Sequence, residues 1–311
     1  MKWFKRILVT LAILFTLLTV MYFFFPGVIV SLSQSIDRSR AHLTEKSLRI
    51  DDHRIVYLEG GQGDTIVLLH GFGAEKDNWT KFAAFLTPRY HVVIPDLPGF
   101  GESTKNNNSK YDIASQASRV KKFIDALGIR KIHIAGNSMG GAIAGSFSLQ
   151  YGNMVTTLGL FNSGGVKSPN KSEYIKMMEQ GKNPLLVENA DDFDRMLGML
   201  FVRAPKIPSP VKRHLASQSI RNRPFNEKIM NDYKKNPFTL EPRLGELSMP
   251  VLILWGDRDR LLDVSSASVF AAGIRNNTTA IMKECGHIPM VERPDEAAGI
   301  YLKFLHANKG R

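Results

Sequence analysis

Short runs of consecutive apolar residues recur along the chain and predict buried strands. The runs are TIVLLHGFG (65–73), HVVIPDLPGFG (91–101), KIHIAGNS (131–138), VTTLGLFN (155–162) and VLILWGD (251–257). Continuous Val, Ile and Leu positions indicate strands that are covered on both faces, as in a parallel sheet flanked by helices.

Between these runs the apolar residues change to helical spacing. Residues 113–127 place one apolar stripe on a helix face, and Gly128 follows as a stop. Residues 294–306 repeat this pattern near the end of the chain, and an irregular strand pair at 48–58 begins the series. The alternation of strands and helices predicts a doubly wound, mostly parallel α/β sheet.

Residues 166–246 interrupt the alternation, because they contain amphipathic helical patches and no convincing strand. They hold fifteen Lys and Arg against ten Asp and Glu, a net charge of +5, and five of the twelve methionines. We predict a helical cap here, inserted into a core made of 48–165 and 247–311. Bulky or flexible apolar cap residues are expected to line a pocket for a long apolar ligand chain or, alternatively, to form the cap's own small core. The residues singled out for the pocket are Met196, Met199 and Phe201.

The N-terminus carries nineteen uncharged residues at 7–25, preceded by three basic ones. At about 1.5 Å per residue such a helix spans the roughly 30 Å hydrocarbon core of a bilayer. We predict an uncleaved membrane anchor over 1–30 and a polar stem over 31–47, with the folded domain that follows on the periplasmic or extracytoplasmic side. The alternative is a cleaved signal peptide.

Charge and cysteine content narrow the function classes. The net charge of +12 comes without a compact basic block or a nucleic-acid motif, so a surface that faces anionic lipid headgroups is favoured over nucleic-acid binding. The single cysteine, Cys285, excludes an internal disulfide and a CxxC metal site.

The stretch GNSMG at 136–140 matches G-x-S-x-G between an apolar strand and a helical run. A sharp strand-to-helix turn strains the backbone of its serine, and the flanking glycines give it room. Ser138 is therefore predicted to be a nucleophile, with the N–H of Met139 facing a developing oxyanion. The alternative is that the glycines serve only helix–sheet packing.

A serine nucleophile needs a base and an orienting acid later in the chain. His287, in CGHIPMVERP, follows the strand-like TTAIMKE and is the predicted base. Asp259, in WGDRDRL, is the predicted acid, and Asp257 is expected to fix the turn. In HGFG, Phe72 is predicted to supply the second oxyanion N–H, and His70 to hold that loop in place.

Taken in order, HGFGAEKDNW, PDLPGFGES, GNSMGG, WGDRDR and GHIPMVERP resemble the α/β-hydrolase superfamily over roughly 48–308. With the N-terminal apolar segment, they look like the bacterial lipases of the Moraxella and Psychrobacter type and the membrane-anchored animal monoacylglycerol lipases. The resemblance implies a serine carboxylester hydrolase that acts on acylglycerols or other lipid esters at a membrane. It implies no metal, no cofactor and no obligatory protein partner.

Three other functions share parts of this pattern. Hydrolases that cleave carbon–carbon bonds of aromatic ring-fission products use a similar elbow, but they usually carry tryptophan after the histidine, where this chain has Ile288. A general short-chain carboxylesterase would use the same residues. A catalytically inactive binding domain would typically lack the serine or the histidine, and both are present here.

Overall fold

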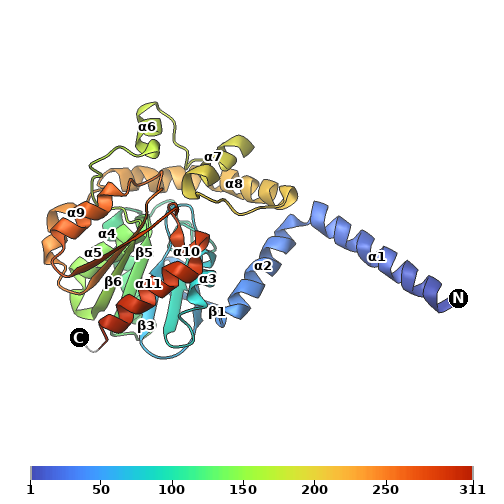
Figure 1. The fold of residues 1–311 in the computed structure, drawn as a ribbon, viewed down its shortest axis with the longest axis horizontal. Helices are drawn as coiled ribbons and strands as arrows, with labels where there is room; N and C mark the ends of the chain where they lie inside the picture. The colour runs from blue at the N-terminus through green and yellow to red at the C-terminus, as the bar shows by residue number, and fades with distance from the viewer. Residues whose placement is uncertain (1, 310–311) are drawn as a thin grey trace.

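The computed structural model describes residues 2–309 and has a central sheet with helices on both faces (Figure 1). The eight strands follow the order β1-β2-β4-β3-β5-β6-β7-β8. β2 pairs antiparallel with both β1 and β4, and every other pairing is parallel. The predicted doubly wound, mostly parallel sheet is therefore confirmed. The strands are β1 (Leu43–Ile50), β2 (His53–Gly60), β3 (Thr65–Leu69), β4 (His91–Pro95), β5 (Ile132–Asn137), β6 (Val155–Phe161), β7 (Val251–Gly256) and β8 (Asn277–Met282).

Alternate residues of the inner strands supply two separate cores, one on each face of the sheet. Val67 and Leu69 of β3 belong to one cluster, and Ile66 and Leu68 belong to the other. All four side chains are fully buried, so the continuous apolar run reflects burial on both faces.

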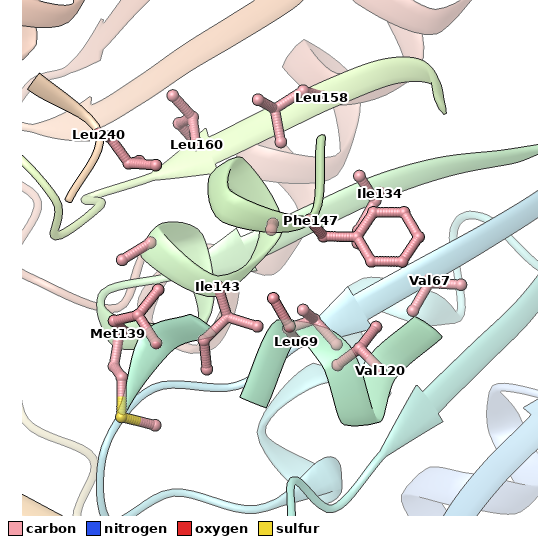
Figure 2. Packing of buried hydrophobic residues seen from close by; sticks show 14 of the residues in the cluster. Val67, Leu69, Val120, Ile134, Met139, Ile143, Phe147, Leu158, Leu160 and Leu240 are labelled. Carbon is pink, nitrogen blue, oxygen red and sulfur yellow. The ribbon is translucent and has the colours of Figure 1, made fainter. Parts of the chain in front are cut away.

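Helices cover both clusters. The first lies under α4 (Ile113–Ala126), α5 (Met139–Gln150) and α9 (Ser265–Gly273), as Figure 2 shows for Val120 of α4 and Phe147 of α5. The second lies under α3 (Thr80–Ala83), α10 (Pro289–Glu292) and α11 (Pro294–Ala307). The helices predicted at 113–127 and 294–306 are α4 and α11.

The segment between β6 and β7 contains α6 (Glu173–Glu179), α7 (Ala190–Leu200), α8 (Ser209–Lys234) and the 3-10 helix η3 (Glu241–Glu246). In Figure 1, α6, α7 and α8 lie together beyond one end of the sheet. This segment corresponds to the cap predicted at 166–246. Val187, Phe193 and Ala216 form a small apolar cluster that joins α7 to α8. Part of the cap therefore has a core of its own.

The N-terminal region differs from the predicted anchor and stem. The region forms two helices, α1 (Lys2–Phe24) and α2 (Pro26–Arg40), so the boundary predicted at residue 30 falls inside α2. The first strand, β1, begins at Leu43 instead of residue 48. The positions inside β1 are mostly exposed because it is an edge strand, so its polar residues show no strand pattern. Within residues 2–309, α1 is the single helix that is long and apolar enough to cross a membrane, with a mean hydropathy of 2.5.

Candidate active site

Ser138 stands at the turn between β5 and α5 in an unusual backbone conformation. Its φ is 56° and its ψ is −121°, in a region that residues other than glycine rarely occupy. Ser138 is partly exposed, whereas its neighbours Asn137 and Met139 are buried. The turn thus presents one hydroxyl to the outside of the core, as expected for a strained nucleophile position.

The two flanking glycines are required by close backbone contacts. A Cβ on Gly136 would lie 2.2 Å from the carbonyl oxygen of Gly140. A Cβ on Gly140 would lie 2.4 Å from the carbonyl oxygens of both Leu69 and His70, at the end of β3. The glycines therefore allow the tight turn around Ser138 and also the close packing of α5 against the sheet.

His287 and Asp259 meet in a buried pair at the ends of β8 and β7. His287 Nδ1 lies 2.8 Å from Asp259 Oδ2, and the two residues are 2% and 7% exposed. The other carboxylate oxygen, Oδ1, accepts the N–H groups of Leu261 at 2.8 Å and Leu262 at 3.0 Å. Asp257 instead lies 3.7 Å from the ammonium group of Lys283. Of the two aspartates, Asp259 is the one in contact with His287.

Two asparagines that were not predicted from the sequence hold this arrangement together. Asn162 donates its side-chain amide to Asp259 Oδ2 at 2.7 Å, and Asn137 donates to the carbonyl oxygen of His287 at 3.0 Å. Asn162 follows β6 with a φ of 43°, and Asn137 is the residue before the serine. The strand-end positions are the only local signal that could have suggested them.

The loop after β3 lies directly beside Ser138. A Cβ on Gly71 would be 3.2 Å from the Ser138 Cβ, and Phe72 is inside the turn closed by the N–H of Ala74 and the carbonyl of Gly71. Met139 begins α5, whose first N–H groups have no partner within the helix. Both predicted oxyanion donors thus belong to segments that adjoin the serine.

His70 holds this loop in place. Its Nδ1–H donates to the Gly71 carbonyl at 2.8 Å, and its Nε2 accepts the N–H of Leu97 at 2.9 Å. Complete burial lowers the pKa of the His70 imidazole, so the ring is neutral and can make both bonds at once. His70 therefore has the structural role that the sequence suggested.

The three cap residues proposed for a pocket have different surroundings. Met196 packs against the small cluster that joins α7 to α8, and Met199 is buried. Phe201 lines a cavity of about 370 Å³ together with Val202 and Asp259. A role in binding an acyl chain stays a prediction for all three.

Thiol chemistry would need a reactive cysteine, and metal binding would need a cluster of ligands. Burial raises the pKa of the Cys285 thiol to about 12, so it is not a thiolate nucleophile at neutral pH. The part of the chain that the structure describes contains no group of three His, Cys, Asp or Glu residues that could hold a metal ion.

Glu292 connects the cap to the loop that carries His287. Its Oε2 accepts the N–H of Gly286 at 2.9 Å, and its Oε1 accepts those of Val202 at 3.0 Å and Arg203 at 2.8 Å. The N–H of His287 itself donates to the Leu200 carbonyl at 2.8 Å. The end of α7 and the histidine loop are thus fastened together by four hydrogen bonds.

We expect Glu292→Gln to lower both stability and activity. A glutamine keeps one acceptor oxygen for three N–H groups, which should cost about 1–2 kcal/mol of unfolding free energy. A small displacement of His287 should lower kcat/KM about tenfold. Thermal unfolding and ester hydrolysis measure the two effects.

Glu284→Gln is the matched control, because Glu284 pairs with Arg258 where both side chains are more than half exposed. Its loss should cost less than about 0.5 kcal/mol. Equal effects of the two substitutions would show that the Glu292 contacts have no special role.

Comparison with known proteins agrees with this architecture. The family model described as alpha/beta hydrolase fold matches residues 64–186. Lipase 1 of Psychrobacter immobilis is 34% identical over 86% of both chains, and monoacylglycerol lipase abhd6-B of Xenopus laevis is 32% identical over 79% of this chain and 76% of its own. A crystal structure described as a membrane phospholipase A and bacterial virulence factor is 42% identical, with a TM-score of 0.91 over 99% of this chain and 100% of its own. The chain therefore belongs to the family of hydrolases with the α/β-hydrolase fold.

Proposed function

We propose that this protein is a serine carboxylester hydrolase that cleaves acylglycerols or related lipid esters through an acyl-enzyme on Ser138. The contact between His287 and Asp259, at 2.8 Å beside the strained serine turn, carries this proposal. The similarity to named lipases and monoacylglycerol lipases supports the lipid ester as the substrate class.

The hydrogen bond between His287 and Asp259 assigns the roles of the two ring nitrogens in the proposed reaction. A carboxylate can only accept, so Nδ1 of His287 carries the hydrogen toward Asp259 and Nε2 is left as the base. Nε2 takes the proton of Ser138 as its oxygen attacks the ester carbonyl, and then gives that proton to the leaving alcohol. Water repeats the sequence on the acyl-enzyme and releases the fatty acid.

Charge that develops on the carbonyl oxygen needs donors that are already in place. The backbone N–H groups of Phe72 and Met139 are assigned this role because their segments adjoin Ser138. Removing one such donor typically lowers kcat by about 10² to 10³. These groups also bind the carbonyl oxygen, which leaves the alcohol part of the ester to other residues.

A hydrolysis screen tests the substrate class. Monoacylglycerols, diacylglycerols, triacylglycerols and phospholipids should be compared with p-nitrophenyl esters of graded chain length, with Ser138→Ala as the inactive control. We expect turnover of lipid esters that depends on Ser138. Cleavage of an aromatic ring-fission product without any ester hydrolysis would contradict the proposal.

We also propose that α1 anchors the enzyme in a membrane, with the catalytic domain on the periplasmic or extracytoplasmic side. Most of its apolar side chains that the structure describes are exposed, as suits contact with lipid. The following helix, α2, is fixed to the catalytic domain, because Arg38 makes two hydrogen bonds to Asp77 at 2.7 and 2.6 Å and Gln34 donates to Glu75 at 2.8 Å. Such contacts would hold the active site at a set distance from the bilayer.

Deletion of residues 1–24 is expected to give a water-soluble enzyme that keeps its activity on short esters. The cut falls before α2, so the contacts of Gln34 and Arg38 remain. The full-length protein should stay in the membrane pellet after washing with high salt and carbonate. Recovery of a shortened, freely soluble form from the native host would show instead that the segment is a cleaved signal peptide.

A further inference from the structure

Tyr233, near the end of α8, reaches from the cap to the serine turn. Its hydroxyl oxygen lies 2.8 Å from the position that a Cβ on Gly164 would occupy, and the Ser138 carbonyl oxygen is 3.5 Å from that same position. The N–H of Gly164 donates to this carbonyl at 2.9 Å. The phenol oxygen of Tyr233 is therefore a polar atom of the cap that lies close to the backbone at Ser138.

The helix end that carries Tyr233 is fastened to the core. Asp232, its neighbour, accepts the N–H of Tyr111 at 3.1 Å. Earlier on the same helix face, Ile229 is fully buried, and Phe225 packs edge-on against Tyr111 with ring centroids 5.3 Å apart. The Tyr233 side chain is thus held in position before any ligand arrives, which makes its hydroxyl a preorganised group.

The Tyr233 hydroxyl has no hydrogen-bond partner among the residues that the structure describes. The Tyr111 hydroxyl, in contrast, donates to the carbonyl of Asn106 and accepts its N–H. Burial, with a smaller contribution from the nearby Tyr174, raises the pKa of Tyr233 to about 12, so the hydroxyl stays protonated at neutral pH. The Tyr233 side chain is only partly buried, and its hydroxyl, unlike that of Tyr301, is not sealed from solvent, so a ligand can take the place of water there.

The chemistry of the substrate limits what this partner can be. An acyl chain has no polar atom, and the backbone N–H groups of Phe72 and Met139 are assigned to the ester carbonyl. The polar atoms that remain are those of the alcohol part of the ester. We propose that the Tyr233 hydroxyl hydrogen-bonds to a free hydroxyl of a glycerol leaving group, an assignment that rests on the proposed function. Tyr233 would then favour acylglycerols over esters of simple alcohols.

Tyr233→Phe tests this assignment, because it removes only the hydroxyl. The full-length variant should be compared with the native enzyme on a monoacylglycerol and on the ethyl ester of the same fatty acid. We expect kcat/KM to fall about 5- to 20-fold for the monoacylglycerol and to change less than about twofold for the ethyl ester. An equal loss on both substrates, or no loss on either, would overturn the proposal.

Tyr301→Phe provides the matched control. The Tyr301 hydroxyl also lacks a partner, but Tyr301 lies on the buried face of α11 and its hydroxyl is sealed inside the core. Its removal should leave kcat/KM unchanged on both substrates, and a selective loss on the monoacylglycerol would overturn the assignment to Tyr233. Ser138→Ala separates the two levels of the proposal: if it stays active, the proposed function itself fails. If it is inactive and Tyr233→Phe still treats both substrates alike, only the role of Tyr233 fails.

Discussion

Ser138→Ala is expected to lower kcat for ester hydrolysis by about 10⁴-fold or more, and His287→Ala should have a similar effect. The two side chains act as one unit, so the loss of either removes the activated nucleophile. The Ser138 substitution keeps the Cβ and the backbone of the turn, so its thermal midpoint should stay within about 2 °C of the native value. Purified variants and a p-nitrophenyl ester are sufficient for the measurement.

The double variant gives this prediction a sharper form. Because the serine and the histidine depend on each other, Ser138→Ala combined with His287→Ala should be no slower than either single variant. Additive losses would mean that the two residues act in separate steps. Retention of more than a few per cent of activity in Ser138→Ala would show that another group is the nucleophile.

Asp259→Asn is expected to be the second largest loss, about 10³- to 10⁴-fold in kcat. The Asp259 carboxylate accepts four hydrogen bonds, from His287, Asn162 and the N–H groups of Leu261 and Leu262. An asparagine must turn its NH₂ group toward one of these pairs of donors. If it faces His287, the imidazole is held in the wrong tautomer or displaced.

Asp257→Asn is the control for this prediction, because Asp257 lies two residues earlier on the same turn and contacts Lys283 rather than His287. We expect its kcat to stay within about fivefold of the native value. If the asparagine at 257 caused the larger loss, the assignment of Asp259 as the orienting acid would be wrong.

The parts of the fold that could be predicted from the sequence are those in which burial requires a recognisable run of apolar residues. β3, β5 and β7 are covered on both faces, so their residues form continuous apolar runs that single them out. The serine turn was also readable, because the close contacts of Gly136 and Gly140 exclude any side chain there. Local composition therefore indicated both the sheet and the tight turn on which the candidate nucleophile stands.

The N-terminal region was harder to read because its contacts are made with distant segments. α2 contacts the catalytic domain through Gln34 and Arg38, whose partners Glu75 and Asp77 lie about forty residues away. β1 exposes most of its positions and so has no alternating pattern. No periodicity within 31–47 separates such a segment from a polar stem.

The supporting residues of the site were missed for the same physical reason. Asn162 and Asp259 are 97 residues apart, and Asn137 and His287 are 150 apart, so only the folded sheet brings them together. Tyr233 lies in a cap whose path over the core is not encoded by any short motif. Candidates for the nucleophile, the base and the acid could be named from the sequence, whereas the residues that contact these candidates could be named only from the structure.

Labelling with a fluorophosphonate probe, followed by peptide mass spectrometry, tests the central claim most directly. The probe reacts with a serine only when a neighbouring base activates it. We predict one adduct, on the peptide that contains Ser138, and its disappearance in His287→Ala and in the unfolded protein. An adduct on any other residue, or no adduct on the active native enzyme, would contradict the account.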